Sequence, residues 1–247
     1  MKGILSRLLF IGLFFLVNTG IASADIIEVN FVRVSDNAPQ LLNLEDQLHL
    51  TIADKSSALA LYQQTINDDQ VLFAFTNVVG INSSISEIYL DDAWTSSGYP
   101  ANPETDNPYF ASPQIINSLG GSTYFTLGAN PANLPEWATL SPSFQATTIL
   151  SVDSVGNPSR GIDTSTDILG LVYTVIPDTS ILAGISAALA SGDLRIGMHV
   201  TSIDPGDYSD SFVNTTVVTP VPEPASMLLV GTGLAGLVGV RLRRKKK

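Results

Sequence analysis

Short runs of alternating apolar and polar residues, separated by turn-forming residues, fill the middle of the chain from Asp25 to Thr219. Successive side chains of a β-strand point to opposite faces, so this alternation is typical of strands with one buried face. We therefore predict a mainly β protein, with an antiparallel, jelly-roll-like β-sandwich over residues 25–219. The clearest runs place apolar residues at Ile27, Val29 and Phe31, at Leu48, Leu50 and Ile52, at Val71, Phe73 and Phe75, and along 86–90, 123–127, 144–150, 168–176 and 194–200.

One helical segment is expected within this domain, over residues 179–190. Asp178 can cap its first turn, and Gly192 is suited to end it because glycine tolerates the left-handed conformation. The apolar residues that share one face of this helix are Ile181, Ile185 and Leu189. The predicted fold is thus a sandwich with a single short helix.

The first 24 residues have the three parts of a secretory signal peptide. Lys2 and Arg7 give a basic start, residues 8–17 form an apolar run, and the small residues Ala22 and Ala24 precede Asp25. We expect a signal peptide helix over residues 1–24, cleaved by signal peptidase after Ala24. The alternative is an uncleaved anchor, but the apolar run is shorter than the ~20 residues of a spanning helix.

The last 28 residues, 220–247, combine three further elements in a fixed order. Pro222-Glu223-Pro224 comes first, and residues 225–240 follow without a charged side chain. These 16 residues would form about 24 Å of transmembrane helix, which is short for a bilayer. The chain ends in the basic residues Arg241, Arg243, Arg244, Lys245, Lys246 and Lys247. Such a cluster stays in the cytoplasm, so the middle domain is expected on the outer side of the membrane.

Pro222-Glu223-Pro224, the short apolar segment and the basic end together resemble the PEP-CTERM sorting signal of Gram-negative and related bacteria. The resemblance implies that a membrane-embedded exosortase recognises and processes the tail. It also implies an inner-membrane-anchored precursor, a final location at the cell surface or in the extracellular matrix, and an association with exopolysaccharide. It assigns no activity to the domain that precedes the tail.

Composition excludes several classes of function. The chain has no cysteine, so disulfides, thiolate metal sites and cysteine nucleophiles are absent. Residues 25–219 contain four basic residues and 22 carboxylates, which leaves a formal charge of −18. Nucleic acid is excluded as a partner, because phosphate binding requires clustered Lys and Arg.

Catalytic chemistry has few candidates in this sequence. The two histidines, His49 and His199, lie in no recognisable motif, and we assign no catalytic residue. Paired carboxylates could still form a glycosidase site, since only their separation in space matters. A non-enzymatic protein is the prediction, and a secreted carbohydrate-active enzyme is the alternative.

Two kinds of binding site are worth testing. Calcium is a possible ligand of the acidic turns, at Asn67-Asp68-Asp69, at Asp91-Asp92, and at Asp204, Asp207 and Asp210, although solvated turns are the plainer interpretation. The aromatic residues Trp94, Tyr99, Tyr109, Phe110 and Trp137 could stack on sugars, or could instead anchor a long loop on the sandwich.

The sequence therefore predicts an exported, exosortase-sorted protein of the cell surface or biofilm matrix, with a structural or adhesive role and exopolysaccharide as the expected polymer. No cofactor is assigned. The second alternative to this function is a type I membrane protein whose tail is never processed.

Overall fold

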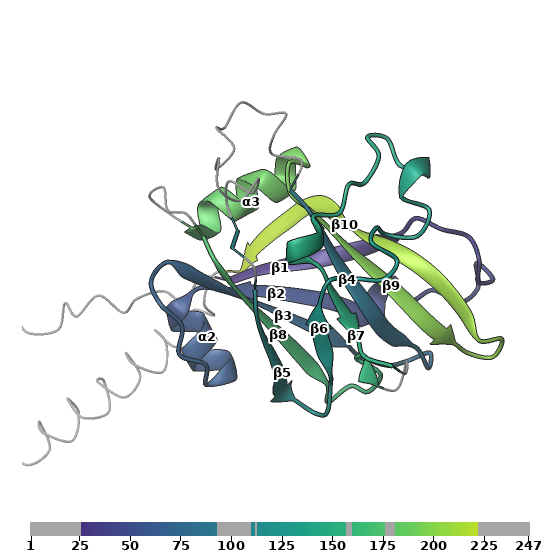
Figure 1. Ribbon diagram of the computed structural model, residues 1–247, viewed down its shortest axis with the longest axis horizontal. Helices are drawn as coiled ribbons and strands as arrows, with labels where there is room; N and C mark the ends of the chain where they lie inside the picture. Colours follow the sequence, from purple (N-terminus) through teal and green to yellow (C-terminus); the bar gives the residue numbers. More distant parts are fainter. Residues whose placement is uncertain (1–25, 93–109, 112, 157–159, 176–180, 222–247) are drawn as a thin grey trace, which may run out of the picture.

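Antiparallel strands make up most of the computed structural model, which describes residues 26–92, 110, 111, 113–156, 160–175 and 181–221 (Figure 1). The predicted signal peptide and C-terminal helix lie outside these residues. The mainly β, antiparallel character of the predicted fold is confirmed.

The described strands form one sheet in the order β5-β8-β3-β2-β1-β10-β9-β4-β7-β6. Every neighbouring pair in it is antiparallel. The strands are β1 (Ile26–Arg33), β2 (Leu48–Ala53), β3 (Gln70–Asn77), β4 (Ser84–Asp91), β5 (Gln114–Gly120), β6 (Phe125–Leu127), β7 (Val152–Ser154), β8 (Ile168–Thr174), β9 (Arg195–Ile203) and β10 (Tyr208–Val221).

The sheet curls until its two edge strands, β5 and β6, meet, which makes a nearly closed barrel. No backbone ladder joins these two strands among the pairs described; the side chain of Asn117 joins them instead. Its amide donates to the Phe125 carbonyl at 3.1 Å, and its Oδ1 accepts from the Phe125 N–H at 2.6 Å. Thr123 Oγ1 also donates to the Asn117 carbonyl at 2.8 Å.

The predicted sandwich of two packed sheets is replaced by this single curled sheet. β10 is the reason, because its 14 residues pair with β9 over residues 208–213 and with β1 over residues 212–221, so one strand joins the two parts of the sheet. Register shifts between Val29 and Phe31, and between Tyr208 and Asp210, mark bulges that bend these strands. Alternation in the sequence identifies the buried face but not whether a sheet is split or continuous.

The inside of the barrel holds the main hydrophobic core, and the apolar residues predicted for β1, β2 and β3 are all buried there. Three aromatic rings pack edge to face at its centre. The ring centroids of Phe73 and Tyr173 are 5.0 Å apart, and Phe110 lies 5.3 Å from Tyr173. A second cluster lies outside the sheet and includes Tyr89, Leu134 and Phe144.

The described ranges contain two α-helices beside the strands. The predicted helix is confirmed as α3 (Ile181–Ser191), which buries Ile185, Ala188 and Leu189 in the core and is followed by Gly192 with φ +80°. The second, α2 (Lys55–Tyr62), was not predicted. Its buried residues include Ser57 and Ala58, so it lacks the apolar stripe that would have indicated it. Three short 3₁₀ helices are also described: η1 (Glu45–Gln47), η3 (Trp137–Thr139) and η4 (Thr148–Leu150).

Two strand predictions need correction. Residues 144–150 form no strand, because Phe144 packs on the outer cluster whereas Leu150 packs in the barrel core, so the segment crosses from one to the other. β5 was not expected and is a half-exposed edge strand with no clear alternation. Within the described ranges, no helix combines the length and apolar character needed to span a membrane.

Candidate functional site

The site is built at one end of the barrel, where β1 ends and β10 begins. Asp210 lies here, with its side chain fully buried. Its Oδ1 accepts from Ser35 Oγ at 2.7 Å and from the Asn37 N–H at 2.9 Å. Its Oδ2 accepts from the Ala38 N–H at 3.2 Å and lies 2.8 Å from Arg33 Nη2. One carboxylate thus fixes the loop that follows β1.

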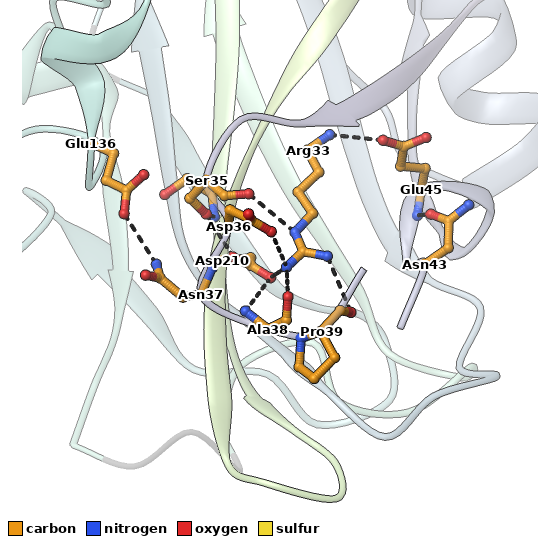
Figure 2. Close-up of polar contacts among 11 residues, drawn as sticks. Arg33, Ser35, Asp36, Asn37, Ala38, Pro39, Asn43, Glu45, Glu136 and Asp210 are labelled. Carbon is orange, nitrogen blue, oxygen red and sulfur yellow. Dashed lines mark hydrogen bonds and ion pairs between the residues drawn. The ribbon is translucent and has the colours of Figure 1, made fainter. Parts of the chain in front are cut away.

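The guanidinium of Arg33 completes this arrangement (Figure 2). Its Nε donates to the Ser35 carbonyl at 3.1 Å and its Nη1 to the Pro39 carbonyl at 3.4 Å, while Nη2 donates to Ala38. The backbone N–H of Arg33 donates to Glu45 Oε1 at 3.0 Å. Arg33 therefore ties the loop to Asp210 and to η1, and its charge is compensated within the protein.

A pocket of about 640 Å³ opens beside this loop. We call it the distal pocket, since it lies at the opposite end of the β1–β10 ladder from Ile26 and Val221. At ~3.3 Å per residue along β1, the distance from Ile26 to Arg33 is about 23 Å. Its lining residues carry carboxylate, amide and hydroxyl groups almost throughout: Arg33, Val34, Ser35, Asp36, Gln40, Asn43, Glu45, Glu136 and Thr139.

The far wall of the distal pocket is formed by η3 and the residue before it. Glu136 lies opposite the loop, and its Oε1 accepts from Asn37 Nδ2 at 3.3 Å (Figure 2). Leu134 and Phe144, both fully buried, hold this wall on the outer face of the sheet. Between the lining residues Glu136 and Thr139, the Trp137 side chain is 37% exposed. A polar pocket with a partly exposed tryptophan next to one of its lining residues in the chain suits a ligand rich in hydroxyl groups.

The cations of the domain are all engaged inside it. Arg33 pairs with Asp210, Lys55 Nζ lies 2.9 Å from Asp68, Arg195 pairs with Asp91 and stacks over Phe144, and Arg160 lies over the Tyr124 ring at 5.6 Å. The described part of the chain therefore presents no cluster of uncompensated positive charge. An anionic polymer has little to bind, and the carboxylates of the distal pocket would repel it.

His199 lies in a separate row of titratable side chains across β7, β4 and β9. Its Nδ1 is 2.6 Å from Glu87 Oε2, and Glu87 is the register partner of both His199 and Asp153. Burial and the neighbouring Glu87 raise the pKa of Asp153 to about 6. His49 lies on β2, paired with Thr76, so the two histidines share no site.

Among the described residues, no group of three or more His, Cys, Asp or Glu side chains is placed to hold a metal ion. Asp68 pairs with Lys55, Asp92 accepts from Thr147, and Asp204 accepts from Asn82 Nδ2 at 2.8 Å. Asp210 is buried under Arg33, so the regular spacing of Asp204, Asp207 and Asp210 does not bring their carboxylates together.

The predicted aromatic surface is only partly supported. Phe110 is 2% exposed and belongs to the barrel core, so it cannot contact a ligand. Trp94, Tyr99 and Tyr109 lie outside the described residues. Trp137 is 37% exposed and follows the lining residue Glu136 in the chain.

The predicted processing residues are also outside the described part of the chain. These are Ala22 and Ala24, Pro222, Glu223 and Pro224, and Arg241, Arg243, Arg244, Lys245, Lys246 and Lys247. Their flanking strands are described: Ile26 begins β1, Val221 ends β10, and the two residues are register partners. Both ends of the folded domain therefore leave it at one point, which we call the terminal end of the barrel.

The fold and its two ends define an antiparallel β-barrel domain followed directly by a short tail. Residues 220–245 match the PEP-CTERM protein-sorting motif, which confirms the resemblance seen in the tail. The chain is an exosortase-sorted, exported protein, made as a membrane-anchored precursor. The comparisons with curated proteins and with solved structures gave no match.

The residues of the distal pocket were not identified from the sequence, apart from the neighbouring Trp137. Arg33 carries one usable signal, because it is one of only four basic residues in a domain with 22 carboxylates. A rare cation in such a domain is expected to hold a structural ion pair. Nothing in the sequence indicated that its partner is Asp210, 177 positions away.

Proposed function

We propose that the mature protein is a non-enzymatic component of the cell surface or extracellular matrix, and that it binds a neutral exopolysaccharide in the distal pocket. The observation that carries this proposal is the position and chemistry of that pocket. It lies at the end of the barrel away from both membrane-directed segments, and its lining is polar. A precursor held by its tail would present this pocket outwards.

Electrostatics narrows the class of polymer. The lining residues include three carboxylates, on Asp36, Glu45 and Glu136, against Arg33, which is already paired with Asp210. Desolvating an anionic sugar beside these carboxylates is unfavourable, whereas hydroxyl groups can both donate to carboxylates and accept from amides. A neutral glycan therefore fits the pocket better than an acidic one.

The experiment uses mature protein from its host and the extracellular polysaccharide of that host, separated into neutral and anionic fractions. We expect retardation by the neutral fraction in affinity gels and little change with the anionic one. Trp137→Ala should weaken retardation by about tenfold, which corresponds to ~1.4 kcal/mol of lost stacking. Tyr124→Ala is the control, because Tyr124 is 50% exposed and, unlike Trp137, has no chain neighbour that lines the pocket.

Two outcomes would contradict the proposal. Equal mobility with and without the neutral fraction would remove the binding function from this domain. Shorter chains or new reducing ends accumulating with time would show an enzyme, and would turn attention to the carboxylates Glu87 and Asp153. Detection of the intact tail on surface-located protein would instead support the alternative of an unprocessed type I membrane protein.

A further inference from the structure

The terminal end of the barrel carries an exposed apolar element whose role is separate from glycan binding. α2 follows Ala53, the register partner of Ile26, after a single residue. Tyr62, its last residue, packs with Ile26 in a small cluster outside the main core. Figure 1 shows α2 on the side of the barrel where the arrowhead of β10 ends. The helix therefore lies next to the point where the chain leaves the domain in both directions.

The last turn of α2 exposes two large apolar side chains. Leu59 is 56% exposed and Leu61 is 55% exposed, and Ala60 between them is also exposed. The helix is well fixed, because Asp54 Oδ1 accepts from the Ser57 N–H at 2.8 Å and Gln63 closes the other end in the left-handed conformation. Two exposed leucines on a rigid projection are costly in water unless something covers them.

The length of chain beyond the domain identifies what covers them. Only residues 222–224 separate the end of β10 from the apolar segment that starts at Ala225. Three residues span at most about 11 Å when extended. In the membrane-anchored precursor the terminal end must therefore lie against the bilayer, within reach of the headgroup region.

We infer that the last turn of α2, with Leu59 and Leu61, inserts into the lipid headgroup layer of the membrane-anchored precursor. The contact is apolar rather than electrostatic, since Lys55 is paired with Asp68 and the domain carries a large negative charge. It holds the terminal end at a fixed height above the bilayer and leaves the distal pocket facing outwards. It depends on the anchored precursor and not on the proposed glycan.

The absence of cysteine allows a direct test with the full chain. Ala60→Cys and Val78→Cys are each labelled with an environment-sensitive fluorophore, and each protein is reconstituted into phosphatidylcholine vesicles containing brominated lipid. Val78 is the matched control: it is 54% exposed and follows Asn77, the partner of Leu48 at the opposite end of the sheet. Flotation with the vesicles verifies anchoring.

We expect the fluorescence quenching of the label at position 60 to be at least about twice that of the label at position 78. Interfacial apolar groups lie ~5–10 Å into the headgroup boundary, where the brominated lipid can reach the label. Leu59→Ser with Leu61→Ser should abolish this difference, whereas Leu41→Ser, which alters a 95% exposed leucine, should not. Equal quenching at both positions in floating vesicles would contradict the proposed lipid contact. The exposed leucines of α2 would then be assigned to contact with a protein partner. Failure to float would contradict the anchored precursor itself.

Discussion

Arg33 Nη2 lies 2.8 Å from Asp210 Oδ2, with the two side chains only 12% and 0% exposed. The pair joins the end of β1 to the start of β10 and fixes the loop that lines the distal pocket. Removing one member of a buried ion pair leaves the other charge uncompensated, and that costs more than the pair contributes. The shape of the pocket therefore depends on a residue that does not line it.

Asp210→Asn should lower the free energy of unfolding by about 3 kcal/mol or more, because Arg33 would remain buried without its counter-charge. Urea unfolding of the mature protein measures this change. Asp36→Asn is the control: Asp36 is 76% exposed and 3.8 Å from the same guanidinium, so its loss should cost less than about 1 kcal/mol. Equal effects of the two substitutions would show that the buried contact has no special role.

Asp153→Asn should stabilise the protein above pH 6 and have no effect below pH 4. Burial and Glu87 raise the pKa of Asp153 to about 6, from an ordinary value of 3.8. Between these values the folded state binds more protons than the unfolded state, so the contribution of Asp153 to stability is lost as pH rises. Because the side chain is partly exposed, the gain above pH 6 should be only about 0.5 kcal/mol.

Thermal melting of wild type and Asp153→Asn across pH 4–8 provides the measurement. The two curves of melting temperature against pH should separate between pH 4 and pH 6 and run parallel above. A constant offset over the whole range would mean that the substitution acts through packing and not through ionisation.

Asn117→Ala should open the junction between the edge strands β5 and β6. The Asn117 side chain makes both hydrogen bonds to the Phe125 backbone, and the lost pairing should cost about 1–3 kcal/mol. Amide exchange of the Phe125 N–H is the specific readout, and it should become faster. Asn82→Ala, which removes an exposed contact to Asp204, should change stability by less than about 0.5 kcal/mol. Unchanged exchange at Phe125 would show that the barrel closes without Asn117.

Much of the fold could be predicted because alternation reports burial directly. The run along 194–200 was among the alternating strands predicted, and its apolar residues Leu194, Ile196, Met198 and Val200 are all fully buried. The continuity of the sheet could not be predicted, because it depends on β10 pairing with two different strands. α2 was missed because its pattern of burial is not the usual one for a helix. Its buried residues, Ser57 and Ala58, are small, whereas its leucines face solvent.

The candidate site was harder to predict than the fold. Its polar residues come from a loop after β1, from η1 and from η3, which are brought together only by folding. Asp210 was noticed in the sequence for its regular spacing with Asp204 and Asp207, which suggested calcium. Its real partner is Arg33, since a single buried carboxylate beside a guanidinium is satisfied without a metal.

Export should remove residues 1–24 and leave Asp25 as the first residue of the mature chain. The small residues Ala22 and Ala24 define the cleavage position, and Ile26 begins β1 two residues later. Cleavage there keeps the whole of β1, including the pairing of Ile26 with Ala53 and Val221. N-terminal sequencing checks this, and a mature chain that starts at Met1 or inside β1 would contradict it.

Glu223→Ala should block processing of the tail without disturbing the domain. Glu223 comes two residues after Val221, the last residue of β10, so the substitution should leave melting of the domain unchanged. Insertion should also persist, because the apolar segment 225–240 and the basic residues after it are untouched. Recognition by the exosortase would be impaired, and full-length precursor should accumulate in the membrane.

A triple substitution of Arg241, Arg243 and Arg244 by Ala should fail in a different way. With less positive charge after the apolar segment, the C-terminal end is retained less strongly in the cytoplasm. A fraction of the protein should then pass fully through the membrane before its tail is processed. A C-terminal tag separates these outcomes: it should be absent from wild-type surface protein, retained in the membrane fraction with Glu223→Ala, and secreted in part with the triple variant. A tag that stays on wild-type surface protein in a host with an active exosortase would show that the motif in this tail is not used for sorting, and that the tail is a permanent anchor.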